Sequence, residues 1–312
     1  MPDTAAHMSA THIPAYTLKP TQTVAVAPIE STPVASVPRF IDDVASGRVE
    51  LPTIPRIVQR VIAALRDPDA DARTVCDLLA QDPVLSAKVL RAANSSHFGA
   101  GRAIASIDAA VARIGTQALG RLIVACGVSS AFKPIPGIEL PVFWRDALVA
   151  ATAAHRLAQT LQADPEEAYL CGLLHASGHL ILCQSYPEIA QAMFAGFETV
   201  RGAELAAIER DSFGIDHPEA GALWVQYLGF PQTVAAAIRQ LGVNLDDKAA
   251  PIDLALRGGC ALAATVARKQ PVAAGLAALP ASVRARCTAA DGTADRAFER
   301  LYETLVATEP MA

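Results

Sequence analysis

The chain has 312 residues, and apolar residues make up 52% of it while charged residues make up 18%. A chain of this length and composition can form one large or two ordinary globular domains. The net charge of −5 is the opposite of the basic excess that is typical of nucleic-acid binders, so we expect no nucleic-acid partner.

Three further features concern the environment of the protein. The longest apolar stretches are interrupted by Gly, Ser or Pro and are shorter than the roughly 18 apolar residues of a spanning helix. The first residues show neither the basic cluster nor the long apolar segment of an export signal. The 6 cysteines form no close C-x-x-C pair, which is typical of free thiols in a reducing compartment. We therefore expect a cytoplasmic protein without membrane insertion.

Residues 1–38 are rich in Thr, Pro, Ala, Ser and Val and show no periodicity. Repeated prolines without periodicity predict a disordered or extended arm. Such an arm could be a tether, a docking peptide or a plain tail. From Phe40 onward the composition changes, and apolar residues recur at helical spacing.

The first strongly periodic segment predicts a helix over residues 53–66, and a second helix follows at 72–81. Asp82-Pro83 then supplies an N-cap and a first-turn proline for a helix that runs to Asn94. The next segments are predicted as a loop, two helices and a connector: 94–99, 106–115, 116–126 and 133–141.

A long helix is predicted over residues 142–161. Asp164-Pro165 then combines an N-cap and a first-turn proline with a capping-box glutamate, and we expect the helix that it opens to carry His175. Further helices are predicted in the rest of the chain: 186–197, 202–212, 217–228, 231–241, 253–269 and 295–307. No segment of this sequence alternates apolar and polar residues in the way that is typical of a strand, so the sequence predicts an all-α fold.

The segment from Leu173 to Leu182 resembles the central motif of the HD superfamily of metal-dependent phosphohydrolases. In that motif a His-Asp pair lies near the end of an apolar helix, and a Gly and a Lys follow. Here His175 stands at the histidine and Ala176 stands at the aspartate. The resemblance implies a hydrolase scaffold that has lost a metal ligand, because alanine has no donor atom.

Two regions together resemble the HDOD family, the HD-related output domains of bacterial signalling proteins. The first consists of short pieces between Leu51 and Gly115. The second contains four pieces in order: Trp144, the His175 segment, Phe213-Gly214-x-Asp216-His217, and Trp224 with Phe230-Pro231. The resemblance covers roughly residues 40 to 242 and rests on the order and spacing of many small pieces.

The resemblance also implies where further ligands of an active member would lie. Asp146 stands at a family histidine, His179 stands at the lysine, and His217 matches a later family histidine. The remaining positions carry residues that depart from the family's ligands: Leu241, Gly242 and Gly259-Cys260. At most two of the expected ligands persist, so we expect no catalytic residue, no bound metal and no cofactor.

A mononuclear metal site is one alternative, with four candidate ligands: Asp146, His175, His179 and His217. Two of them, His175 and His179, would share one helix face if their helix continued without a break. His155 is about half a turn out of phase with Asp146 and should face elsewhere. Otherwise His175 and His217 are buried histidines satisfied by hydrogen bonds, or they line a regulatory ligand pocket.

Other residues have both a structural and a functional interpretation. Asn94-Ser95 could cap its helix and bridge the following loop, or it could contact a ligand. Lys88 and Arg91 could form a solvated face or part of a partner surface. We expect Trp144 and Trp224 to be core anchors between the two halves.

The sequence thus predicts an HD-like bundle of many helices in two interlocking halves. The expected parts are an arm, a domain of two halves and a C-terminal helical extension: 1–38, 39–245 (39–135 and 136–245) and 246–312. By resemblance, we expect a non-catalytic bacterial signalling or regulatory module that contacts a protein partner. A small ligand such as a nucleotide could control this contact by binding in the vestigial HD cleft, which the resemblance places at Asp146, His175, Ala176, His179 and His217. The alternatives are a residual metal-dependent phosphohydrolase and a cyclic-nucleotide sensor.

Overall fold

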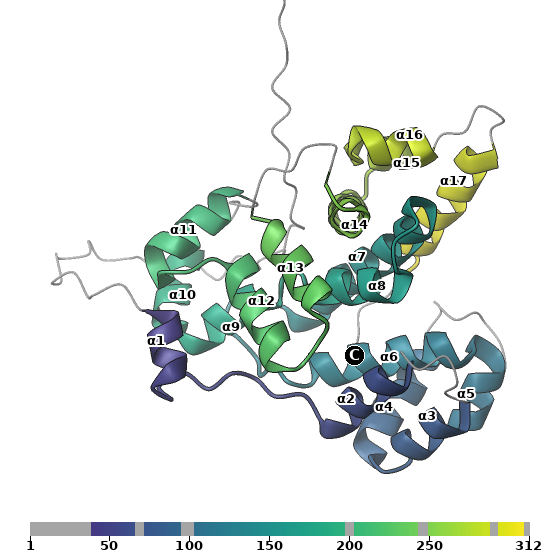
Figure 1. Ribbon diagram of the computed structural model, residues 1–312, viewed down its shortest axis with the longest axis horizontal. Helices are drawn as coiled ribbons and strands as arrows, with labels where there is room; N and C mark the ends of the chain where they lie inside the picture. Colours follow the sequence, from purple (N-terminus) through teal and green to yellow (C-terminus); the bar gives the residue numbers. More distant parts are fainter. Residues whose placement is uncertain are drawn as a thin grey trace, which may run out of the picture.

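The computed structural model describes residues 39–65, 72–94, 103–196, 203–242, 249–287 and 293–308. Within these residues the chain forms helices α1 to α17 and no β-strand, so the predicted all-α fold is confirmed (Figure 1). Each of these helices is too short or too polar to span a membrane. The predicted arm and Ser95 lie outside the described residues.

The N-terminal lobe is formed by α2 to α6, which pack on one another. Their bounds are Arg56–Leu65 (α2), Ala72–Leu79 (α3), Pro83–Ala93 (α4), Ile107–Ile114 (α5) and Thr116–Ser129 (α6). The Asp82 side chain accepts a hydrogen bond from the Leu85 N–H at 2.9 Å, which confirms the predicted cap of α4. α2 begins three residues later than predicted, because residues 51–55 are non-helical and run to the central lobe.

The central lobe is formed by α7 to α13. Their bounds are Leu140–Leu161 (α7), Pro165–Leu174 (α8), Ser177–Ser185 (α9), Pro187–Gly196 (α10), Ala203–Phe213 (α11), His217–Tyr227 (α12) and Gln232–Gln240 (α13). Asp164 caps α8 as predicted, because its Oδ1 accepts hydrogen bonds from the N–H groups of Glu166 and Glu167 at 2.9 Å each. α8 ends at Leu174 and His175 is its C-cap residue, still with helical backbone angles, so the helix that Asp164 opens carries His175 at its end.

The two lobes interlock at an aromatic hub of Phe132, Trp144 and Trp224, which are all buried. The incoming segment passes the hub at Pro52, whose carbonyl accepts a hydrogen bond from Trp224 Nε1 at 2.7 Å. The returning segment carries Phe132, whose ring centroid lies 5.6 Å from that of Trp144 and 5.3 Å from that of Trp224. Both tryptophans therefore anchor the core between the halves, as predicted.

The first helix, α1 (Phe40–Ala45), belongs in space to the central lobe. Tyr186, which follows α9, donates a hydrogen bond from its hydroxyl to Asp43 Oδ2 at 2.7 Å. Figure 1 shows α1 in purple beside α10 and well away from α2 to α6. The chain therefore starts on the central lobe, forms the N-terminal lobe and returns to the central lobe. The two lobes interlock because the chain crosses between them twice.

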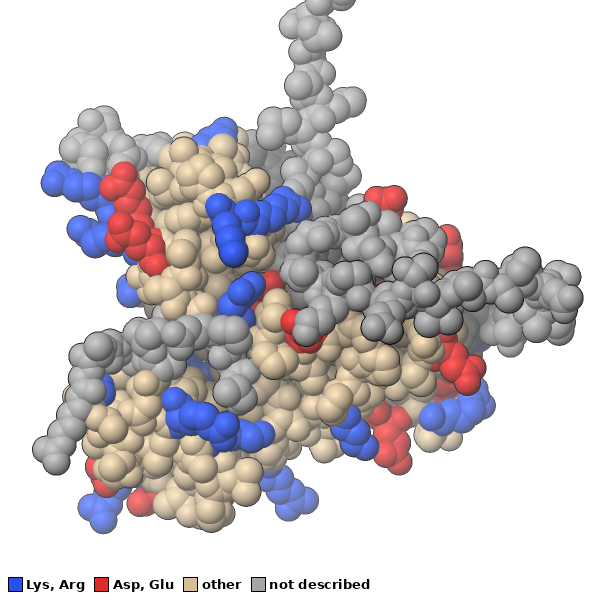
Figure 2. Space-filling view, turned by 180° about the vertical axis from the view of Figure 1, so that it is seen from behind, with Lys and Arg blue, Asp and Glu red and all other residues tan. Residues whose placement is uncertain are grey.

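The C-terminal helices form a further layer on α7 and α8. Their bounds are Pro251–Ala267 (α14), Val272–Ala278 (α15), Ala281–Cys287 (α16) and Thr293–Val306 (α17). Gly259 lets α14 approach α7 closely, because a Cβ at this position would lie 2.6 Å from the Ala150 carbonyl oxygen. On the described part of the face in Figure 2, Lys and Arg side chains are interspersed with Asp and Glu side chains.

Candidate functional site

His175 lies in the turn between α8 and α9 and is buried. Its Nδ1 is 2.7 Å from the Gly172 carbonyl oxygen. A carbonyl only accepts hydrogen bonds, so Nδ1 carries the hydrogen and Nε2 presents a lone pair. Nε2 is buried and has no hydrogen-bond partner among the described residues. Burial lowers the pKa of His175 to about 4, so its imidazole is neutral.

Ala176 occupies the second position of this turn and is buried. It contributes no side-chain hydrogen bond to the start of α9. The turn is closed instead by Ser177, whose Oγ donates to the Leu174 carbonyl oxygen at 2.7 Å. Because methyl groups coordinate nothing, the position that resembles the HD aspartate supplies no metal ligand here.

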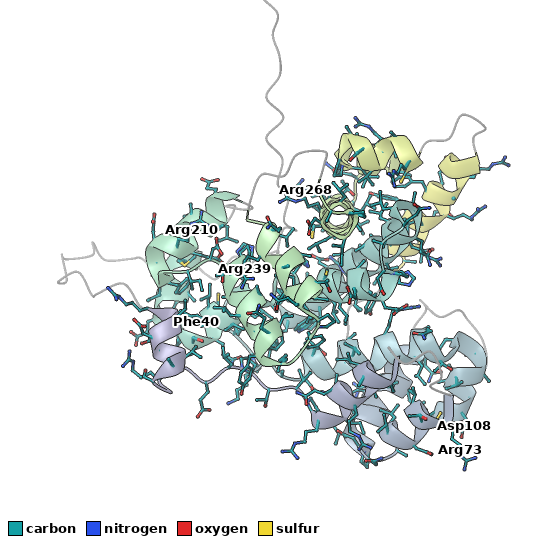
Figure 3. All side chains as sticks on the ribbon, in the orientation of Figure 1. Phe40, Arg73, Asp108, Arg210, Arg239 and Arg268 are labelled. Carbon is teal, nitrogen blue, oxygen red and sulfur yellow. The ribbon has the colours of Figure 1, made fainter. Side chains whose placement is uncertain are left out.

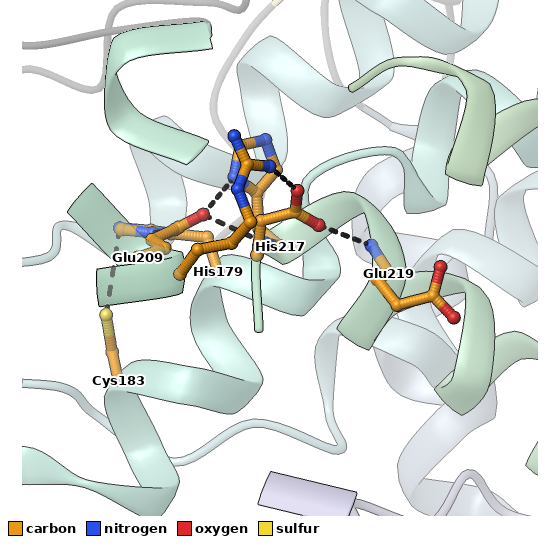
Figure 4. Close-up of polar contacts among 7 residues, drawn as sticks. His179, Cys183, Glu209, His217 and Glu219 are labelled. Atoms are coloured by element: carbon orange, nitrogen blue, oxygen red, sulfur yellow. Dashed lines mark hydrogen bonds and ion pairs between the residues drawn. The ribbon is translucent and has the colours of Figure 1, made fainter. Parts of the chain in front are cut away.

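A buried carboxylate, Glu209 of α11, joins the two other histidines of the region (Figure 4). Its Oε1 lies 2.7 Å from Nδ1 of His179 on α9. Its Oε2 contacts Nδ1 of His217 and accepts the His217 backbone N–H at 2.8 Å. One glutamate thus holds the first turns of α9 and α12, and these three residues are called the Glu209 cluster below.

The electrostatics of the Glu209 cluster favour an ion pair. Burial alone would raise the pKa of Glu209, but the charge on His217 and the hydrogen bonds from both histidines lower it to about 2. Burial alone would also lower the pKa of His179. The neighbouring Cys183 sulfur, 3.7 Å from Nε2, and the Glu209 carboxylate outweigh burial and raise this pKa well above its ordinary value.

Local sequence explains how the cluster is placed. Asp216 caps α12, since its Oδ1 accepts the Glu219 N–H at 3.0 Å, and its other oxygen pairs with Arg210. This cap makes His217 the first residue of α12. Gly178 brings α9 against α12, because a Cβ there would lie 2.0 Å from the His217 carbonyl oxygen. A larger residue at position 178 would force the two helices apart.

Asp146 is buried on α7 and does not join the Glu209 cluster. Its Oδ1 accepts hydrogen bonds from Arg145 at 2.9 and 2.6 Å, and its Oδ2 has no partner among the described residues. Burial raises the pKa of Asp146, although Arg145 opposes this shift. His155 lies elsewhere, as predicted, and contacts Glu166 and Arg121.

The donor set does not fit the metal centre of an HD hydrolase. Ala176 has no donor atom, and Glu209, the buried carboxylate of this region, already pairs with His179 and His217. Among the described residues, no group of three or more His, Cys, Asp or Glu side chains is arranged to hold a metal ion. Of the four candidate ligands, His179 and His217 lie together in the Glu209 cluster. His175 and Asp146 each lie in a different environment.

The candidate contacts on the N-terminal lobe lie at the end of α4. Asn94 bridges to Ile104: its Nδ2 donates to the Ile104 carbonyl at 2.8 Å, and its Oδ1 accepts the Ile104 N–H at 2.7 Å. This is the structural role expected for Asn94, while its neighbour Ser95 lies outside the described residues. Lys88 is half-buried and Arg91 is exposed on the same helix.

Glu209 is the site residue that sequence reasoning missed. One signal could have found it, since Glu209 shares the buried face of α11 with Ala206 and Phe213 at spacings of three and four residues. A glutamate on an apolar face requires a partner, because an unpaired buried charge is costly. The identity of that partner follows from tertiary structure.

Comparisons with known proteins agree with this architecture. A family model described as the HDOD domain matches residues 51–241. A crystal structure of a protein from Shewanella amazonensis, provisionally named a phosphohydrolase, is 29% identical with a TM-score of 0.65, and the match covers 86% of this chain and 96% of that chain. A protein from Marinobacter aquaeolei, provisionally named for signal transduction, is 26% identical with a TM-score of 0.65, over 84% of this chain and 60% of that one.

Two further relatives add to the picture. The structure of an HDOD domain protein from Geobacter sulfurreducens shares the fold, with 24% identity, a TM-score of 0.61 and coverage of 85% of this chain and 95% of that chain. A protein of Treponema pallidum is 27% identical over 207 residues, which are 66% of this chain and 39% of that protein. This chain therefore matches well under half the length of that relative.

Proposed function

This chain belongs to the HDOD domain family, and on that premise we propose that it is a non-catalytic signalling module whose output is a contact with a partner protein. One observation carries the proposal: the buried Ala176 stands where the resemblance places the metal-binding aspartate, and no group of three or more His, Cys, Asp or Glu side chains among the described residues replaces it. A metal hydrolase needs imidazoles and carboxylates that converge on a cation with open coordination positions. Here the buried carboxylate of the region, Glu209, pairs with His179 and His217 instead.

The partner surface is proposed on α4. Lys88 and Arg91 lie one turn apart on this helix, and Arg91 is exposed. Asn94 fixes the end of the same helix through Ile104, so the two basic side chains stand on a rigid element. The partner is then a protein of a bacterial signalling pathway in the cytoplasm with acidic groups at its contact surface.

An activity assay tests the catalytic part of the proposal. The chain is incubated with Mn²⁺ and either bis(p-nitrophenyl) phosphate or a cyclic dinucleotide, beside a His175→Ala variant as control. We expect both proteins to give the same background. Turnover that disappears in the variant would contradict the proposal. A thermal shift with the cyclic dinucleotide, without hydrolysis, would replace it by a nucleotide-sensing function.

A capture experiment tests the partner surface. Tagged wild type is compared in bacterial lysate with the double variant Lys88→Glu/Arg91→Glu, and the matched control is Arg73→Glu on the neighbouring helix α3 (Figure 3). We expect the double variant to lose a protein that wild type and the control retain. Equal capture by all three proteins would rule out α4 as the contact surface.

One observation favours a second function, a residual metal-dependent phosphohydrolase. The lone pair of His175 Nε2 is buried without a partner while Nδ1–H is held by a backbone carbonyl. Metal-binding histidines are commonly oriented by such a hydrogen bond on the opposite nitrogen. This function requires a stoichiometric metal ion and activity that the His175→Ala variant lacks.

A further inference from the structure

Arg121 of α6 contacts three side chains across the boundary between the lobes. Its Nη1 lies 2.7 Å from Glu166 Oε1 and 3.3 Å from His155 Nε2, and those two atoms are 3.3 Å apart. The guanidinium carbon lies 5.7 Å from the ring centroid of Tyr169, whose hydroxyl donates to the Arg121 carbonyl at 3.5 Å. These residues are called the Arg121 cluster.

Other described connections between the lobes lie at the aromatic hub and at Gln184, whose Oε1 accepts a hydrogen bond from the Lys133 N–H at 3.3 Å. The incoming segment at 46–55 and the returning segment at 130–139 are mostly non-helical, and both meet Trp224 there. Segments of this kind absorb backbone rotation, while the packed helices on either side move as units. The geometry therefore provides a pivot at the hub and a separate polar contact from α6 to α7 and α8.

The Arg121 cluster has the properties of a reversible contact. The side chains of Arg121 and Glu166 are 23% and 34% exposed, so water can replace their interaction when they separate. The buried hub rings keep the lobes attached during such a movement, because separating them would expose apolar surface. Opening the cluster therefore does not require either lobe to unfold.

We propose that Arg121 is a latch that holds the N-terminal lobe in one orientation on the central lobe, and that its release lets the N-terminal lobe turn about the hub. This inference concerns the motion of the chain and is independent of whether the output is a protein contact. In the latched orientation α6 contacts α7 and α8 through the Arg121 cluster. In the released orientation this contact is absent. Any ligand or partner that competes for Arg121 or Glu166 would shift the equilibrium between the two orientations toward the released one.

The test is a distance measurement across the lobes in the full chain. p-Acetylphenylalanine is placed at Val84 on α4 and Tyr227 on α12, which are 69% and 60% exposed. Spin labels are attached through the ketones, so the cysteines remain unmodified, and distances are measured by double electron–electron resonance. We expect one main distance for the otherwise native chain.

The variants are Arg121→Gln and Glu166→Gln, and both should raise the population of a second distance by up to about fivefold. The matched controls are Arg239→Gln and Glu219→Gln, a pair within the central lobe at 2.6 Å with exposures of 34% and 37% (Figure 3). The controls should keep the native distance. Circular dichroism verifies that each variant is folded, and Glu166→Gln preserves the size of its side chain.

Two outcomes would overturn the inference. One is an unchanged distance distribution in folded Arg121→Gln and Glu166→Gln, which would mean that the hub alone fixes the orientation. The other is an equal change in the controls, which would attribute the effect to any lost ion pair.

Discussion

The Glu209 cluster and the Arg121 cluster use the same residue types for different purposes. Each joins a glutamate to a histidine, but Glu209 is fully buried within one lobe whereas Glu166 is 34% exposed between two lobes. Both carboxylates have lowered pKa values, although burial alone would raise them. The comparison shows that burial, rather than the set of side chains, separates a permanent fixture from a contact that can open.

Removal of the buried carboxylate should have the largest effect. Glu209→Ala leaves a buried imidazolium without its counter-charge, and we expect it to lower the free energy of unfolding by about 3–5 kcal/mol. Glu204→Ala, on an exposed position of the same helix, should change it by less than about 0.5 kcal/mol. Urea unfolding measures both, and similar midpoints for the two variants would refute the fixture role of Glu209.

The loss of stability at low pH should distinguish the Glu209 cluster from the Arg121 cluster. The folded pKa of Glu209, about 2, lies below its ordinary value of 4.5, so its contribution is present above pH 4.5 and is lost as the pH falls toward 2. Glu209→Gln should abolish roughly 3 kcal/mol of this acid-induced loss. Glu166→Gln should abolish less, because solvent screens its pair. Unfolding curves from pH 5 to 2 that stay parallel for wild type and Glu209→Gln would contradict this prediction.

The packing that places the Glu209 cluster can be broken through the backbone. Gly178→Ala puts a methyl group into the His217 carbonyl, so α9 and α12 must separate, at a cost of about 2–3 kcal/mol. Gly242→Ala is the control, since its Cβ would have contacts of 3.6 Å or more. Thermal unfolding compares them, and equal melting temperatures would show that the helices adjust freely.

The smallest effect is expected at the Arg121 cluster. A double-mutant cycle with Arg121→Gln and Glu166→Gln should give a coupling energy of about 0.2–1 kcal/mol, as expected for a partly exposed ion pair. The same cycle on Arg239 and Glu219 should give a similar value. A coupling above about 3 kcal/mol, the range of buried pairs, would remove the distinction between the two clusters.

Features with local causes could be predicted from the sequence. The caps at Asp82-Pro83 and Asp164-Pro165 are hydrogen bonds within one turn, and both are confirmed. The short helices α15 and α16 were not predicted, since seven residues each contain too little periodicity. The sequence suggested a helix end at Gly178, and the break lies three residues earlier, at His175-Ala176.

The candidate site could be predicted only in part, because some of its contacts join segments that are far apart in the sequence. The resemblance identified His175, His179 and His217, and all three are buried in the region of α8, α9 and α12. Glu209 lies 30 residues from His179 along the chain, so no local pattern links them. Its role follows from the way that α11 packs beside α9 and α12.

The central claim is that this region lacks the carboxylate ligand that a metal centre needs, because Ala176 has no donor atom and Glu209 pairs with His179 and His217. The most direct test is elemental analysis, by inductively coupled plasma mass spectrometry, of the full chain purified without chelators. The account predicts substoichiometric Mn, Fe and Zn that do not change in the His175→Ala variant. One tightly bound Mn, Fe or Zn per chain, lost in that variant, would contradict it.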